Sequence, residues 1–272
     1  MAIFVSNLVA GLEQGLDNPQ LLLDMVKPFH NEVGIEFFIH TYSKSYMKRM
    51  EQVRTWAANL PIALHGPFRF VEATSAPGTG EYQTFADAYD QALCLARRLG
   101  CSHLVFHSNE CFVRPEEKQR LKARCLANIE TLIQKAGSMG VTLLLENLAL
   151  PSKGTPLFDC DEYISLFDRF PEAGCLIDVG HLAAARWDIK TVISALAPRI
   201  KGYHLHNNDG VNDSHERLKN GVIDYDSFFK LYRTYTPHGD LTLEYGDNHR
   251  ITPKDMHRDI AWVAKLTQNL NS

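Results

Sequence analysis

The chain has 272 residues, of which 45% are hydrophobic and 22% are charged, a composition typical of globular proteins. A formal net charge of −4 and a pI near 6.3 argue against a broad basic surface for nucleic acid, although a local basic patch is compatible with them. No apolar stretch approaches the roughly 20 residues of a membrane span, no signal-peptide pattern opens the chain, and the six cysteines form no C-x-x-C pair. These features predict a cytoplasmic protein without a membrane partner.

Eight short segments in the chain are almost continuously apolar, as expected of parallel strands covered on both faces. In chain order they span residues 3–5, 34–38, 62–65, 104–107, 143–146, 176–178, 203–206 and 241–244. The first β-then-α unit is the weakest of the eight, so the count of eight is open by one.

Longer amphipathic segments lie between the strands. Residues 84–99 place an apolar stripe on one helical face, and Gly100 follows as a C-terminal stop. Residues 115–136 form a second, charged amphipathic helix, and Thr252-Pro253 opens the last one. Eight β-then-α units in sequence, without a break in composition, predict an α/β fold in which residues 1–272 form a single (β/α)8 TIM barrel domain.

The predicted strands end in side chains that bind metal ions. Six of them end this way, and three more such residues follow closely; the full set is His65, His107, Glu146, Asp178, His181, His206, Asp213, His215 and Glu244. In a barrel the C-terminal strand ends form one face, where burying several carboxylates together is costly unless a cation compensates them. Imidazole with carboxylate suits Zn²⁺, Mn²⁺, Fe²⁺ or Co²⁺. We therefore predict a divalent metal site at the mouth of the barrel.

Strand seven offers two histidines, because His204 and His206 alternate to the same side of the strand and both point inward. Spacing alone does not decide between them. It also leaves open whether one ion is bound by Glu146, Asp178, a strand-seven histidine and Glu244, or whether two or three ions share the larger set.

Several short motifs in this order resemble the xylose isomerase-like TIM barrel superfamily, which includes sugar isomerases, sugar epimerases and endonuclease IV-type AP endonucleases. The motifs are His65-Gly-Pro-Phe, Leu-Leu-Leu-Glu146-Asn147, Leu-Ile-Asp178-Val-Gly-His181, His204-Leu-His206-Asn-Asn-Asp209 and Leu-Glu244. The resemblance covers essentially the whole chain. It implies zinc or manganese as the ion, with one to three ions bound.

The resemblance implies two overlapping ligand sets. The endonuclease IV-like set holds three zinc ions with all nine residues named above, whereas the isomerase set holds one ion. In the family an acid commonly follows the strand-seven ligand by three residues, and Asp209 stands so relative to His206. Since His206 also lies nearer the open end, we favour it as the ligand and assign His204 to the layer behind.

The loops depart from the endonuclease IV pattern, which would show Cys-His after the strand-six aspartate and Asn-Asp-Ser-Lys after the strand-seven histidine. This chain has Val-Gly-His181 and Asn-Asn-Asp209-Gly instead, which is more similar to the sugar phosphate isomerases/epimerases. The arginine that some ketose epimerases carry six residues after the ligand is absent, and Asn212 stands there. A nucleic-acid substrate is therefore disfavoured.

The first hypothesis for the function is isomerisation or epimerisation of a small sugar or sugar-phosphate-like compound through a metal-stabilised enediolate, with Glu146 taking the proton and Glu244 returning it. Substrate contacts are expected from Phe68, Arg69, Trp187 and Arg217, with Phe70, Phe112, Arg186 and Arg250 as further loop candidates. The alternatives are a multi-zinc phosphoesterase and a metal-dependent lyase or dehydratase. The expected partner is a carbohydrate-like small molecule, and a homo-oligomer is compatible with the sequence.

Overall fold

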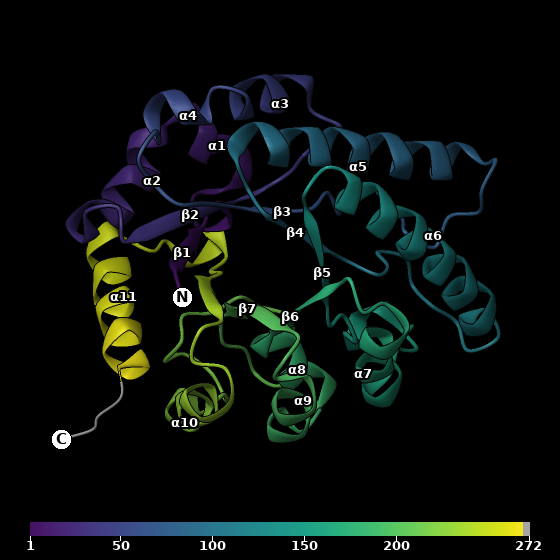
Figure 1. Ribbon diagram of the computed structural model, residues 1–272. Helices are drawn as coiled ribbons and strands as arrows, with labels where there is room; N and C mark the ends of the chain where they lie inside the picture. Colours follow the sequence, from purple (N-terminus) through teal and green to yellow (C-terminus); the bar gives the residue numbers. More distant parts are fainter. Residues whose placement is uncertain (269–272) are drawn as a thin grey trace.

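The computed structural model describes residues 1–268, which form one closed barrel of eight parallel strands ringed by helices (Figure 1). The strands are β1 (Ile3–Ser6), β2 (Val33–Phe38), β3 (Ile62–His65), β4 (His103–Phe106), β5 (Thr142–Glu146), β6 (Gly174–Asp178), β7 (Ile200–Leu205) and β8 (Asp240–Leu243). Neighbours in the sheet follow chain order, and β8 pairs with β1. The predicted TIM barrel is confirmed; residues 269–272 of the predicted domain lie outside the described residues.

The α-helices lie between successive strands. They are α1 (Leu12–Asp17), α2 (Pro19–Val26), α3 (Lys44–Met50), α4 (Val53–Trp56), α5 (Gly80–Leu99), α6 (Lys118–Ser138), α7 (Cys160–Arg169), α8 (Val179–Ala185), α9 (Ile189–Leu196), α10 (Tyr225–Tyr235) and α11 (Pro253–Thr267). Short 3-10 turns follow at η1 (Asn7–Ala10), η2 (Lys27–Phe29), η3 (Pro151–Lys153) and η4 (Asp247–His249). Helix α11 packs beside α2, so the last helix closes the outer ring next to the first ones (Figure 1). Among the helices of residues 1–268, none has the length and apolar character of a membrane span.

Local sequence accounts for where the predicted helices end. Gly100 adopts φ 71° after α5, the left-handed conformation that glycine tolerates, and Thr252 caps α11 in a box with Asp255. The start of α5 was predicted four residues too late, because its first turn, residues 80–83, carries a single hydrophobic residue, Tyr82. Thr79 instead begins the helix by accepting a hydrogen bond from the backbone of Tyr82.

A layer of apolar side chains lies inside the barrel below its mouth. Val105, Leu144 and Leu176 are buried together as a separate cluster. Each precedes by two residues an inward-facing polar residue on its own strand or just past its end, respectively His107, Glu146 and Asp178. The same strands therefore supply an apolar layer and, one layer above it, the polar side chains of the mouth.

Candidate metal centre

All nine predicted ligands converge at the C-terminal end of the barrel. They form overlapping groups in which one atom of each residue lies within 4.8 Å of the others. The groups are His65, His107 and Glu146; His181, His206, Asp213 and His215; Asp178, His206 and Glu244; Glu146, Asp178 and His204; and His65, His204 and Glu244. His107, His206 and Glu244 lie one residue beyond the observed strand ends, so those three strands were predicted one residue too long.

The group of His65, His107 and Glu146 places two imidazoles next to one carboxylate. The Nε2 atoms of His65 and His107 lie 3.2 Å apart, and they lie 3.5 and 3.0 Å from Glu146 Oε2. His65 Nδ1 faces the carbonyl oxygen of Gly66 at 2.8 Å, and His107 Nδ1 faces Glu110 Oε1 at 2.8 Å. Because these acceptors fix the ring proton on Nδ1, each Nε2 presents a lone pair. Two lone pairs and a carboxylate oxygen that face one another fit a bound cation.

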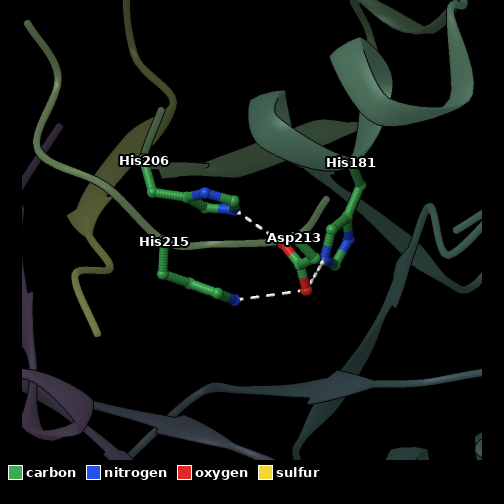
Figure 2. Close-up of side chains that lie close together, drawn as sticks. All are labelled: His181, His206, Asp213 and His215. Carbon is green, nitrogen blue, oxygen red and sulfur yellow. Dashed lines mark hydrogen bonds and ion pairs between the residues drawn. The ribbon is translucent and has the colours of Figure 1, made fainter. Parts of the chain in front are cut away.

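The same lone-pair argument applies to the outer group, which Figure 2 shows around Asp213. Asp213 Oδ2 lies 3.3 Å from Nε2 of both His181 and His215, and Asp213 Oδ1 lies 3.6 Å from His206 Nε2. Asp213 Oδ1 is buried and has no hydrogen-bond partner among the described residues. An orphaned carboxylate oxygen among three ring nitrogens is a second position that fits a divalent ion.

The backbone orients the rings of the outer group. His181 lies on α8 and its Nδ1 faces the carbonyl oxygen of Asn147 at 2.9 Å. His215 lies in the loop before α10 at φ 49°, and its Nδ1 faces the carbonyl oxygen of Glu244 at 2.9 Å. Because each carbonyl oxygen accepts a hydrogen bond from Nδ1, the Nε2 atom of each ring is left unprotonated and faces Asp213. This is the tautomer that a metal ligand requires.

Three carboxylates, those of Glu146, Asp178 and Glu244, surround the buried ring of His204. His204 Nδ1 lies 3.3 Å from Glu244 Oε2, 3.6 Å from Glu146 Oε1 and 3.9 Å from Asp178 Oδ2. Burial opposes a charge on His204, but Glu244 and Glu36 outweigh it and raise the pKa of His204 well above its usual range. The carboxylates respond unequally to their surroundings: burial raises the pKa of Glu244 to about 8, whereas His107 and His204 overcome burial and hold the pKa of Glu146 well below its usual range.

Both strand-seven histidines belong to the cluster. His206 Nε2 lies 3.1 Å from Asp178 Oδ1 and 3.6 Å from Asp213 Oδ1. It therefore lies between the buried carboxylates around His204 and the outer group around Asp213. His206 has room for its ring only because residue 180 is glycine: a Cβ atom there would lie 2.0 Å from His206 Cε1. His204 lies one layer deeper, and the preference for His206 as the ligand stays a prediction.

Glu36 is a component of the centre that sequence reasoning missed. It lies 3% exposed on β2, with Oε1 3.0 Å from His204 Nε2, and its Oε2 accepts a hydrogen bond from Thr242 at 3.2 Å. It occupies the middle of an apolar run rather than a strand end, so the search at strand ends passed it over. A glutamate inside a continuously apolar strand was the available signal.

A cavity of about 240 Å³ opens above the metal-binding groups. Its lining includes Phe68 and Arg69, which were predicted to contact substrate, together with Glu146 and Glu244. The other two predicted contacts, Trp187 and Arg217, do not line it. Trp187 packs against the ring of Tyr163 at a centroid distance of 5.8 Å, and its expected contact with substrate stays a prediction.

The guanidinium of Arg217 is ion-paired with two aspartates of α11, and it does not line the cavity at the mouth. Its Nε and Nη2 donate to the two carboxylate oxygens of Asp259 at 2.9 Å each, and its Nη1 donates to Asp255 at 3.1 Å. Its guanidinium therefore already has a bidentate partner, and its expected contact with substrate stays a prediction.

Arg217→Ala is expected to destabilise the fold while leaving substrate binding unchanged. Asp259 is only 5% exposed and would lose its bidentate partner, which we expect to cost about 2 kcal/mol after allowing for the partial exposure of Arg217. Urea denaturation measures the cost. The structural role is contradicted if stability is unchanged and the apparent affinity for substrate falls.

Comparison with solved structures finds similar chains of nearly equal length. They include a D-tagatose 3-epimerase-like protein, with 16% identity, a TM-score of 0.78 and coverage of 98% of this chain and 97% of that chain. The TTHB071 protein from Thermus thermophilus, soaked with ZnCl2, has 22% identity, a TM-score of 0.68 and coverage of 98% of both chains. IolI with a bound zinc atom has 15% identity, a TM-score of 0.74 and coverage of 98% of both chains. At these identities the likeness establishes the fold.

Sequence comparison places the chain in a family. No curated protein sequence matches it significantly. A family model described as xylose isomerase-like TIM barrel matches residues 31–266, which is most of the chain and includes every predicted metal ligand. The resemblance inferred from the motifs is thereby confirmed: the chain belongs to the xylose isomerase-like TIM barrel family.

Proposed function

We propose that the protein is a divalent-metal-dependent isomerase or epimerase of a small sugar or sugar-phosphate-like compound. The observation that carries the proposal is the placement of two buried glutamates, Glu146 and Glu244, beside metal-binding groups in the wall of one cavity. Their carboxylates lie within 3.6 Å of the same ring nitrogen of His204. The structural neighbours, which include a D-tagatose 3-epimerase-like protein and a D-allulose 3-epimerase in complex with D-allulose, are consistent with this class of reaction.

The residues present fit an ion of the zinc or manganese kind. Asp178, His206 and Glu244 form one metal-binding group, and Glu146 belongs to another that shares Asp178. These four residues would hold the ion, and the mixture of imidazole and carboxylate donors favours such an ion over Mg²⁺ or Ca²⁺. When bound, the ion supplies Lewis-acid polarisation of a substrate carbonyl and a neighbouring hydroxyl.

The chain's own groups move the proton. One carboxylate, Glu146, takes the proton from the carbon next to the substrate carbonyl, and the other, Glu244, returns a proton to that carbon or its neighbour. Phe68 supplies an apolar wall of the cavity. Arg69 is exposed at the cavity rim and has no ion-pair partner among the described residues, so it is free to bind a phosphate or carboxylate of the substrate.

Solvent proton exchange tests the proposal. Protein purified without added metal is analysed for metal content and then incubated in D2O with a panel of ketoses and ketose phosphates. We expect deuterium to enter the substrate next to the carbonyl, and we expect chelation of the ion to stop it. A metal-loaded protein that exchanges no proton in any member of the panel would argue against isomerase chemistry.

A multi-zinc phosphoesterase of the endonuclease IV type is the second candidate. The outer group of His181, His206, Asp213 and His215 supports it, because a single-ion isomerase does not require that group. Two or three ions per chain, together with cleavage of a duplex that contains an abasic site, would favour this candidate. An uncut duplex at saturating Zn²⁺ and Mn²⁺ would remove DNA repair.

A further inference from the structure

The Nδ1 atom of His107 has a carboxylate outside the ligand set as its nearest partner, whereas the Nδ1 atoms of His65, His181 and His215 face backbone carbonyl oxygens at 2.8–2.9 Å. The carboxylates near Nδ1 of His181 and His215 are more distant, at 3.3 and 3.7 Å, and belong to the predicted ligands Glu146 and Glu244. His107 Nδ1 donates to Glu110 Oε1 at 2.8 Å. A carboxylate acceptor fixes the tautomer, as a carbonyl does, and in addition makes the opposite nitrogen a stronger metal donor.

Glu110 is in turn held by two neighbouring loops. Its Oε2 accepts a hydrogen bond from Lys153 Nζ at 2.8 Å. Its backbone N–H donates to Glu72 Oε2 at 3.0 Å, in the loop after β3. Lys153 lies at the end of η3, after β5, and its carbonyl oxygen accepts a hydrogen bond from the backbone of Val113 at 2.8 Å. The lysine therefore has a fixed position beside the glutamate that does not depend on the ion pair alone.

We propose that Glu110 and Lys153 are a positioning pair that orients His107 toward a second ion, which would be held by His65, His107 and Glu146 beside the ion proposed above. Glu110 and Lys153 both line the mouth cavity, so a freely rotating Glu110 carboxylate would lie close enough to compete as a ligand. Lys153 holds that carboxylate behind the ring and balances its charge. The proposal rests on the metal binding proposed above, and it assigns two residues that neither the ligand set nor the acid–base pair includes.

Metal affinity is the direct test. Zn²⁺ affinity is measured by competition with a chromophoric chelator, and the Co²⁺-substituted protein is examined by visible absorption. We expect Glu110→Gln to weaken the binding of one ion about 10-fold or more and to change the Co²⁺ spectrum. Lys153→Met is expected to weaken the same ion about three-fold, and Lys153→Arg to restore it, because the charge is the part that acts on Glu110.

A matched control separates positioning from a general effect of losing a surface glutamate. Glu162 on α7 is ion-paired with Lys118 and Lys122 and is 29% exposed, against 23% for Glu110. Glu162→Gln is expected to leave Zn²⁺ affinity and the Co²⁺ spectrum unchanged.

Two results would overturn the proposal. One is wild-type affinity and an unchanged Co²⁺ spectrum in Glu110→Gln; the other, which serves if that variant does not fold, is wild-type affinity in Lys153→Met. A wild-type protein that binds no ion at all would instead overturn the proposed function on which the pair depends.

Discussion

Glu146→Gln is expected to stop proton exchange and to remove the ion at His65 and His107, whereas Glu244→Gln is expected to stop exchange and leave an ion on His65 and His107. Glu146 belongs to two of the metal-binding groups and faces Nε2 of both histidines, while Glu244 belongs to neither of those two groups. A neutral amide at position 146 cannot supply the negative charge that the Glu146 carboxylate places beside the two Nε2 atoms. Loss of either acid–base carboxylate should slow exchange by about 10²–10⁴-fold.

The contrast between the two variants is measured by metal analysis and by deuterium incorporation on the same preparations. Glu117→Gln is the control, because that glutamate is ion-paired with Arg120 on the outside of the barrel, away from the cavity. Undiminished exchange in Glu146→Gln would show that another group takes the proton. Equal metal loss in both glutamine variants would contradict a separate ion at His65, His107 and Glu146.

Chelation is expected to lower the thermal stability of the protein substantially. Glu146, Asp178 and Glu244 are at most 3% exposed, and without a cation their mutual repulsion is relieved by protons on the neighbouring imidazoles and on Glu244, whose pKa burial raises to about 8. At a free ion concentration of about 1,000 times Kd, binding contributes about 4.1 kcal/mol. For a chain of this size that corresponds to a fall in Tm of roughly 8–16 °C.

Differential scanning calorimetry before and after dialysis against a chelator measures this fall. Re-addition of Zn²⁺ or Mn²⁺ should restore the original Tm, and Ca²⁺ should not, because imidazole nitrogens are poor ligands for it. A chelator-treated protein with unchanged Tm and no residual metal would show that the carboxylate cluster is stable without a cation.

The barrel and its ring of ligands could be predicted because both depend on one periodic signal. Each apolar run marks a buried strand, and the first polar residue after it marks the mouth, as Glu146 and Asp178 illustrate. Errors of one residue at His107, His206 and Glu244 did not matter, since a side chain just past a strand end still points into the mouth.

The remaining features depend on contacts that periodicity does not contain. Glu36 sits in the middle of a strand, and its partner His204 comes from the opposite half of the chain. Glu110 and Lys153 meet only because two loops are joined through Val113. The ion pairs of Arg217 could not be predicted for the same reason: its partners, Asp255 and Asp259, lie on α11, 38 and 42 residues further along the chain.

Gly180 sets the place of the His206 ring in this chain. In this chain the residue before His181 must lack a side chain if the strand-seven histidine is to lie against α8, since a Cβ atom would overlap the ring of His206. A side chain at position 180 would therefore displace the His206 ring from its place beside Asp178, and with it the contact that joins the buried carboxylates to Asp213.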